Sequence, residues 1–292
     1  MLDRFLEGSM RLKEVRSNRI LLATNPPLKN EIVNAASAAR ATVGADVKVL
    51  VLDRPLVMEA TVGCDGATGK IIGFEQFLRQ IQSHSRDFDV LVVSSQIETD
   101  DEKVKTYLER EGGVNIWGGV EAMFSKKASS ALGKPVFHAP VENSKFFKTY
   151  NEIVDPRKSA EMVSLCYVHC CLKGAHKAPV EGALWDKNII PRPDFLVTPI
   201  NIYGPPHISC ETHRIPIIAV VDNKTIHAIR MARNTITVGT YLEAAGVVLA
   251  IKQGISLESI KRPLMKTKIL NGTKNWGISN AQTDTWILSF VW

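Results

Sequence analysis

Six short apolar runs recur along the 292-residue chain, and helical patterns lie between most of them. The runs are continuous, as expected for strands of a parallel sheet that are buried on both faces. Strands that alternate with helices are typical of βαβ units. The sequence therefore predicts an α/β fold with a mostly parallel sheet and helices on both faces. The six runs are residues 20–23, 47–52, 90–93, 136–137, 195–197 and 215–221.

A proline-interrupted stretch at residues 179–193 divides the chain into two lobes. A chain of this length is long enough to bury a large core. We expect a short N-terminal helix at 1–16, one two-lobed α/β domain at 17–265 and an irregular tail at 266–292. Within that domain the lobes span about 17–150 and 190–265, and residues 151–189 form a helical connector.

The composition is that of an ordinary soluble globular protein, with 45% hydrophobic and 23% charged residues. No apolar run approaches the roughly 18 residues that a membrane helix needs. The N-terminus lacks the features of a signal peptide. The five cysteines form no even framework, as expected for reduced thiols. We therefore expect a soluble, cytoplasmic chain that does not bind membranes.

The net charge of +6 is concentrated in residues 252–274, which hold six Lys or Arg residues against Glu258 alone. Nucleic-acid binding needs basic residues along a face, with aromatic side chains for stacking. A local basic segment is more simply a solvated one. The sequence thus predicts a small-molecule ligand and no nucleic acid, and it leaves homo-oligomerisation open.

Polar side chains gather where the apolar runs end. Thr198 and Asn201 follow the run at 195–197, Asn223 follows the run at 215–221, and His138 follows Val136 and Phe137. Ligands of open α/β sheets bind beyond the carboxyl ends of the strands. We therefore predict that these side chains surround one cleft.

Gly118 and Gly119 precede a predicted helix at 120–132. Glycines allow close approach of a ligand, and free N–H groups at a helix start attract anions. The stretch matches neither a Walker loop nor GxGxxG, and a plain glycine turn is the simpler interpretation. Glu121, in the first turn, is most simply an acid favoured by the helix dipole.

The predicted loop between Thr198 and Ile215 carries His207, Cys210, Glu211 and His213. These residue types can bind zinc, but their spacing matches no specific zinc motif. A polar loop with a substrate-facing histidine is the favoured hypothesis, with no metal. In the segment SLCYVHCC, Cys166 and Cys170 lie four residues apart, and we expect both to be buried by core packing without a metal partner.

Several segments together resemble an uncharacterised family, domain of unknown function 3326, from bacteria and photosynthetic eukaryotes. They include DVLVV, GGVEAMFSK, KPVFHAP, DFLVTP, IPIIAVVDNKT and VGTYLEAAGVVLAIKQGIS. The resemblance spans about residues 2–263 and implies one α/β domain, a chloroplast location and no established reaction or cofactor. The resemblance also leads us to expect a further N-terminal segment in relatives, which this chain would lack, and a different tail. We expect the tail to pack poorly, with Trp276, Trp286 and Trp292 lacking an apolar face.

The favoured function is an enzyme that acts on a small anionic metabolite, phosphorylated metabolites included. Gly118 and Gly119 would hold the anion, and His138 or His207 would transfer a proton. The residues that would orient the substrate are Thr198, Asn201 and Asn223. The alternative is a non-catalytic ligand-binding or regulatory protein on the same scaffold, inactive through truncation.

Overall fold

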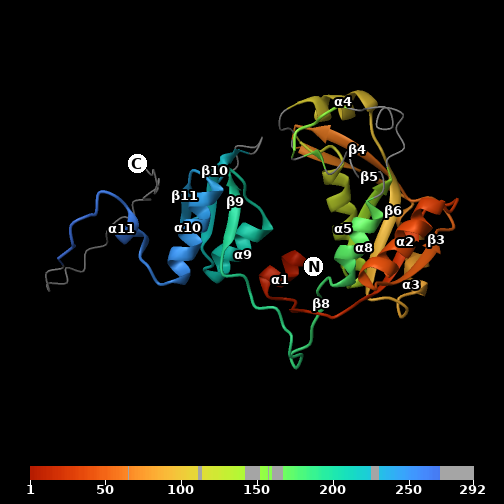
Figure 1. Cartoon of the computed structure of the whole chain (residues 1–292), viewed down its shortest axis with the longest axis horizontal. Coiled ribbons are helices and arrows are strands. Elements are labelled where there is room, and N and C mark those ends of the chain that lie inside the picture. Colours follow the sequence, from red (N-terminus) through yellow and green to blue (C-terminus); the bar gives the residue numbers. More distant parts are fainter. Residues whose placement is uncertain are drawn as a thin grey trace. The chain divides into compact units, whose positions relative to one another are not determined.

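The computed structural model describes residues 1–64, 66–110, 114–141, 152–156, 158–159, 167–224 and 230–269. Its chain divides into two compact units, Met1–Pro191 and Arg192–Trp292, here called unit 1 and unit 2 (Figure 1). Each unit is described by itself. The three tail tryptophans and Cys166 lie outside the described residues.

A parallel sheet forms the centre of unit 1. Strands β3, β2, β6 and β7 lie side by side in that order and are parallel. The hairpin β4–β5 is antiparallel. Strand β4 pairs in parallel with the last residues of β6, which extend past the end of β2. The bounds are β2 (Arg19–Thr24), β3 (Asp46–Val51), β4 (Val57–Gly63), β5 (Gly66–Ile72), β6 (Val90–Glu98) and β7 (Val136–Val141).

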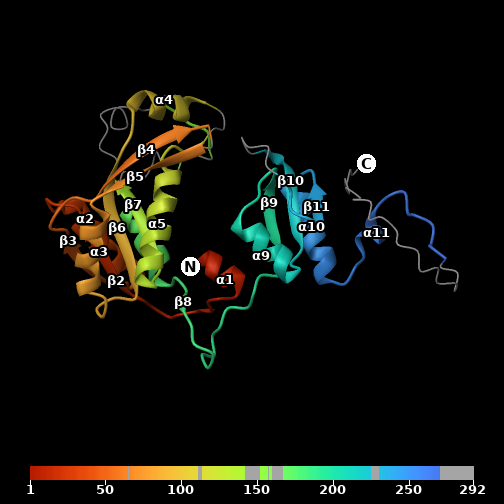
Figure 2. The same ribbon diagram turned by 180° about the vertical axis from the view of Figure 1, so that it is seen from behind.

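Helices cover both faces of this sheet, because successive side chains of a strand point to opposite faces. In β2, Ile20 and Leu22 pack with α2 and α8, whereas Leu21 and Ala23 pack with α3, α4 and α5. This arrangement confirms the predicted α/β class (Figure 2). The helices are α2 (Asn30–Val43), α3 (Phe74–Ser83), α4 (Asp101–Glu109), α5 (Gly118–Leu132) and α8 (Val168–His176).

The N-terminal part of unit 1 adds a short helix and a small ladder. Helix α1 (Leu2–Glu7) ends at Gly8, and an ion pair of 2.9 Å joins Asp3 to Lys126 of α5. Strand β1 (Leu12–Lys13) pairs antiparallel with β8 (Val180–Glu181). The helix is thus much shorter than the segment 1–16 that the sequence suggests.

Unit 2 is a three-stranded parallel sheet in the order β11, β10, β9. Helix α10 packs on one face around Ile218 and Val220, and α9 contributes Cys210 to a smaller cluster with Ile217. The elements are β9 (Leu196–Ile200), α9 (Pro205–His213), β10 (Ile217–Lys224), β11 (Thr235–Val238), α10 (Tyr241–Lys252) and α11 (Leu257–Ile260).

The sequence-based expectation of a polar loop at residues 198–215 is wrong for most of its length, because Pro205–His213 forms helix α9. Pro205 and Pro206 occupy the first positions of that helix. Proline is tolerated there because a backbone N–H in the first turn of a helix would have no intrahelical acceptor. Among the described residues, no helix is long and apolar enough to cross a membrane.

Candidate functional site

Three side chains of unit 1 form a hydrogen-bonded chain between helix α5 and the interior of strands β6 and β7. The Nε2 atom of His138 lies 2.9 Å from the hydroxyl of Ser95, and its Nδ1 atom lies 3.0 Å from a carboxylate oxygen of Glu121. Ser95 belongs to β6, His138 to the neighbouring β7, and Glu121 to the first turn of α5. We call these three residues the relay.

The strand register brings the relay together. Val93 of β6 faces His138 of β7, so that Ser95, two residues further along, points to the same face as His138. That face is the one covered by α5, whose Phe124 packs edge-on against the imidazole with 5.6 Å between ring centroids. Glu121 therefore acts as more than a dipole-favoured acid: it is the hydrogen-bond partner of His138.

The two ends of the relay differ in exposure. Ser95 and the imidazole of His138 are each only 1% exposed, whereas the Glu121 side chain is 26% exposed. A nucleophilic serine needs contact with its substrate, and this one is enclosed. The end of the relay that solvent or a substrate reaches is the Glu121 carboxylate.

Gly118 and Gly119 are the first two residues of α5, and each has a structural role there. A Cβ on Gly119 would lie 2.1 Å from the carbonyl oxygen of Ala67, so this helix end can approach β5 only without a side chain. The N–H of Gly118 donates to the side-chain oxygen of Asn115 at 2.9 Å. The N–H expected to attract an anion thus already has an acceptor, and anion binding at Gly118 and Gly119 stays a prediction.

His207 in unit 2 is also buried and also uses both ring nitrogens. Its Nε2 lies 3.1 Å from the Thr198 hydroxyl, and its Nδ1 accepts the backbone N–H of Gly204 at 3.2 Å. An Nδ1 that accepts a hydrogen bond carries no proton, so the proton sits on Nε2 and is donated to Thr198. Burial lowers the pKa of His207, although Glu211 acts in the opposite direction. This histidine is a neutral cap of α9.

The remaining predicted residues of unit 2 lie near the carboxyl ends of β9 and β10. Asn201 follows β9 in the left-handed region, with φ of 62°. The Asn223 side chain donates to the hydroxyl of Tyr241 at 2.6 Å. The structure brings Thr198 and His207 together, but His138 belongs to the other unit. That all of these residues line one cleft stays a prediction.

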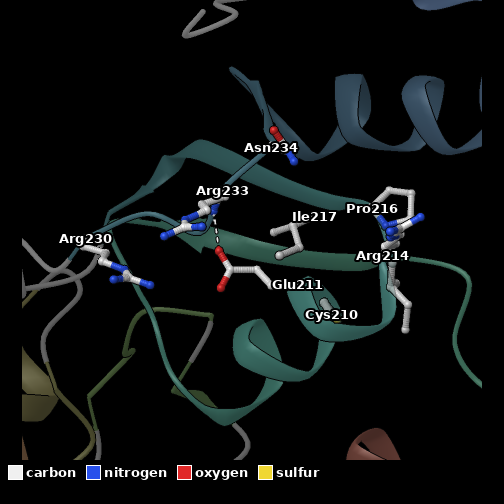
Figure 3. Close-up of a pocket in the computed structure, with 9 residues that line it drawn as sticks. Cys210, Glu211, Arg214, Pro216, Ile217, Arg230, Arg233 and Asn234 are labelled. Carbon is white, nitrogen blue, oxygen red and sulfur yellow. Dashed lines mark hydrogen bonds between the residues drawn. The ribbon is translucent and has the colours of Figure 1, made fainter. Parts of the chain in front are cut away.

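A pocket that the sequence did not suggest lies at the opposite edge of the unit 2 sheet, near the starts of β10 and β11. Its volume is about 720 Å³. It is lined by Cys210, Glu211, Arg214, Ile215, Pro216, Ile217, Arg230, Arg233 and Asn234 (Figure 3). Exposed arginines far apart in sequence give no pattern that separates them from solvated ones, so sequence reasoning had no signal for this pocket.

The cysteine helix differs from expectation. Cys170 is exposed, and the prediction that it is buried is wrong. Helix α8 buries Val168, Leu172 and Ala175, which are spaced four and three residues apart, and Cys170 falls on another face. In the described part of the chain, no three His, Cys, Asp or Glu side chains lie close enough to hold a metal ion.

Comparison with known proteins places the chain in a family but gives no characterised relative. No curated protein and no solved structure matches it. One family model does match, and it covers residues 1–261, which include the relay and the arginine-lined pocket. The chain therefore belongs to the family described as "Protein of unknown function (DUF3326)".

Proposed function

We propose that this protein is an enzyme that acts on a small anionic metabolite and that Glu121, held by the rest of the relay, transfers the proton. The observation that carries the proposal is the pair of hydrogen bonds that joins Ser95, His138 and Glu121. A histidine held between a hydroxyl and a carboxylate is a recurring arrangement for general acid–base catalysis. The structure favours His138 over His207, because a backbone N–H fixes the latter in one neutral form.

The exposure of the three residues decides where a proton enters and leaves. With Ser95 and His138 enclosed, a substrate exchanges its proton with the Glu121 carboxylate, which is the accessible end. His138 then holds and orients that carboxylate through Nδ1, and Ser95 fixes the opposite side of the imidazole. In this role Glu121 contacts the substrate, and His138 and Ser95 are positioning residues.

The experiment is a conversion assay without an assumed substrate. The full chain is incubated with a mixture of phosphorylated and carboxylated metabolites, and mass spectrometry follows which compounds disappear. We expect the wild type to convert at least one of them and His138→Gln to lower that rate about 10²-fold or more. The matched control is His84→Gln, because His84 also lies near a carboxylate, Asp87 at 3.5 Å, but on the surface.

The control should keep the wild-type rate, and circular dichroism should show that both variants fold. A folded His138→Gln variant that converts the metabolite as fast as the wild type would overturn the proposal. Failure of the wild type to convert any compound would do the same. It would favour the second candidate, a non-catalytic ligand-binding protein. The burial of Ser95 and of the His138 side chain supports that candidate.

A further inference from the structure

The pocket of unit 2 carries three arginines and one carboxylate. Arg214 ends α9, and Arg230 and Arg233 precede β11. Within the described residues, the side chains of Arg214 and Arg233 make no hydrogen bond and no ion pair within 4 Å. Two guanidinium groups at the pocket are therefore available to a ligand, each with five N–H donors.

Glu211 does not cancel this positive charge. One of its oxygens accepts the Tyr203 hydroxyl at 2.7 Å, and the other accepts the backbone N–H of Arg233 at 2.5 Å. These hydrogen bonds, with Arg230 and Arg233 nearby, lower the pKa of Glu211, so the group is ionised, and each of its oxygens already accepts a hydrogen bond. With three arginines against one carboxylate, the lining keeps an excess of two positive charges.

Arg230 is held in place by the same network. Its guanidinium donates to the Tyr203 hydroxyl at 2.9 Å and lies over the Tyr203 ring, 4.4 Å from the centroid. Stacking on a ring leaves the in-plane N–H groups of a guanidinium free to donate to other acceptors. Tyr203 and Glu211 thus preorganise Arg230 for an anion.

The rest of the lining is apolar. Ile215, Pro216 and Ile217 contribute aliphatic surface. Cys210 is buried, and burial raises the pKa of its thiol, so the sulfur is neutral and does not repel an anion. A volume of about 720 Å³ exceeds what a bare inorganic anion fills and fits a small organic molecule.

The arginines lie at two ends of the pocket. In Figure 3, Arg230 and Arg233 lie on one side of Glu211, and Arg214 lies on the other side beside Pro216. We propose that this pocket binds a small organic molecule with two separate anionic groups, phosphate or carboxylate, joined by a short apolar body. Arg230 and Arg233 hold one group, and Arg214 holds the other. Binding at this pocket does not depend on the proposed function, because no residue of the relay lines it.

Isothermal titration calorimetry on the full chain tests this assignment with three probes: inorganic phosphate, glutarate and 3-phosphoglycerate. We expect the two-ended probes to bind more tightly than phosphate, with a dissociation constant below about 1 mM for at least one of them. Arg233→Gln should weaken all three probes about 10- to 100-fold. Arg214→Gln should weaken only the two-ended probes.

Two controls separate this inference from the proposed function. Lys252→Gln removes one positive charge from unit 2 outside the pocket and should leave binding unchanged. His138→Gln should bind the probes like the wild type even when conversion is lost. The site assignment is overturned if the wild type binds none of the probes, or if the arginine variants bind as tightly as the wild type. Equal affinity for phosphate and for the two-ended probes overturns the two-group ligand.

Discussion

His138 and His207 have the same kind of neighbour on one side of the ring and different neighbours on the other. Each Nε2 meets a buried hydroxyl, that of Ser95 at 2.9 Å and that of Thr198 at 3.1 Å. At Nδ1, His138 meets a carboxylate, whereas His207 accepts a backbone N–H. A carboxylate can take up and release a proton, but an amide N–H cannot at ordinary pH.

This comparison teaches that burial and a hydroxyl partner at Nε2 do not place a histidine in a proton-transfer site. The partner of the second nitrogen decides its chemistry. In the relay that partner is the Glu121 carboxylate, which is partly exposed to solvent. At His207 the partner is the backbone N–H of Gly204, at the start of the helix that the ring caps. The two sites serve as a matched pair for mutation.

The largest expected effect concerns Glu121. In Glu121→Gln, an amide oxygen still accepts a hydrogen bond from His138, but the group can no longer exchange a proton. We expect kcat for the metabolite identified above to fall about 10²- to 10⁴-fold, with KM changed little. The control is Glu75→Gln, because Glu75 is an acid in the first turn of another helix, α3. Equal losses in the two variants would reduce Glu121 to a helix-dipole acid.

The second test removes the matched hydroxyls. Thr198→Val leaves the Nε2–H of His207 buried without an acceptor, and Ser95→Ala leaves the Nε2 of His138 without its partner. Each should lower the free energy of unfolding by about 1–3 kcal/mol, measured by urea denaturation. Only Ser95→Ala should also lower turnover. An equal loss of activity in Thr198→Val would break the proposed difference between the sites.

A smaller effect concerns acid stability. Because burial lowers the pKa of His207 in the folded state, the unfolded state takes up a proton more readily. The stability that depends on neutral His207 is complete above about pH 6.5, and it is lost as the pH falls below that value towards the folded pKa. Between pH 7.5 and 5.5 the melting temperature should fall, and His207→Asn should reduce the fall by a few degrees at most.

Asparagine is chosen because its side-chain oxygen can accept the Gly204 N–H in place of Nδ1. Differential scanning calorimetry at several pH values gives the comparison with the wild type. The pKa of Glu211 is lowered from an already acidic value, so its titration lies below this window. An unchanged pH dependence in His207→Asn would show that this histidine is not the source.

Much of the fold follows from the apolar runs. The runs at 20–23, 47–52 and 90–93 overlap β2, β3 and β6, and the later runs overlap β7, β9 and β10. Buried parallel strands are continuous in sequence, so they can be recognised one at a time. Strand β3 is an exception, because its run of Val and Leu identified it although none of its residues is buried.

The hairpin β4–β5 escaped prediction for a physical reason. Residues 57–72 mix Val, Ile and Ala with Glu, Thr, Lys and three glycines. Of the residues in the two strands, only Met58 and Gly66 are buried. A strand pair at a sheet edge needs no continuous apolar run, and glycine weakens the strand signal. Helix α9 escaped because Pro205 and Pro206 are also typical of loops.

The candidate site could be predicted only in part. His138 follows an apolar run and was recognised, but its partners come from other elements. The strand register points Ser95 to the same face as His138, and Glu121 reaches the histidine because Gly119 allows α5 to lie close to β5. The arginines of the unit 2 pocket are brought together in the same way by the fold. Contacts of this kind depend on tertiary structure and leave no local pattern.

The state of the two Nδ1 atoms tests the central claim most directly. In the full chain with ¹⁵N-labelled histidine, long-range ¹H–¹⁵N correlation spectra at pH 7.5 show which ring nitrogen carries a proton, and His138→Gln and His207→Asn assign the signals. The account predicts a proton on Nδ1 of His138, donated to Glu121, and none on Nδ1 of His207, which accepts from Gly204. Finding Nδ1 in the same state in both histidines would contradict it.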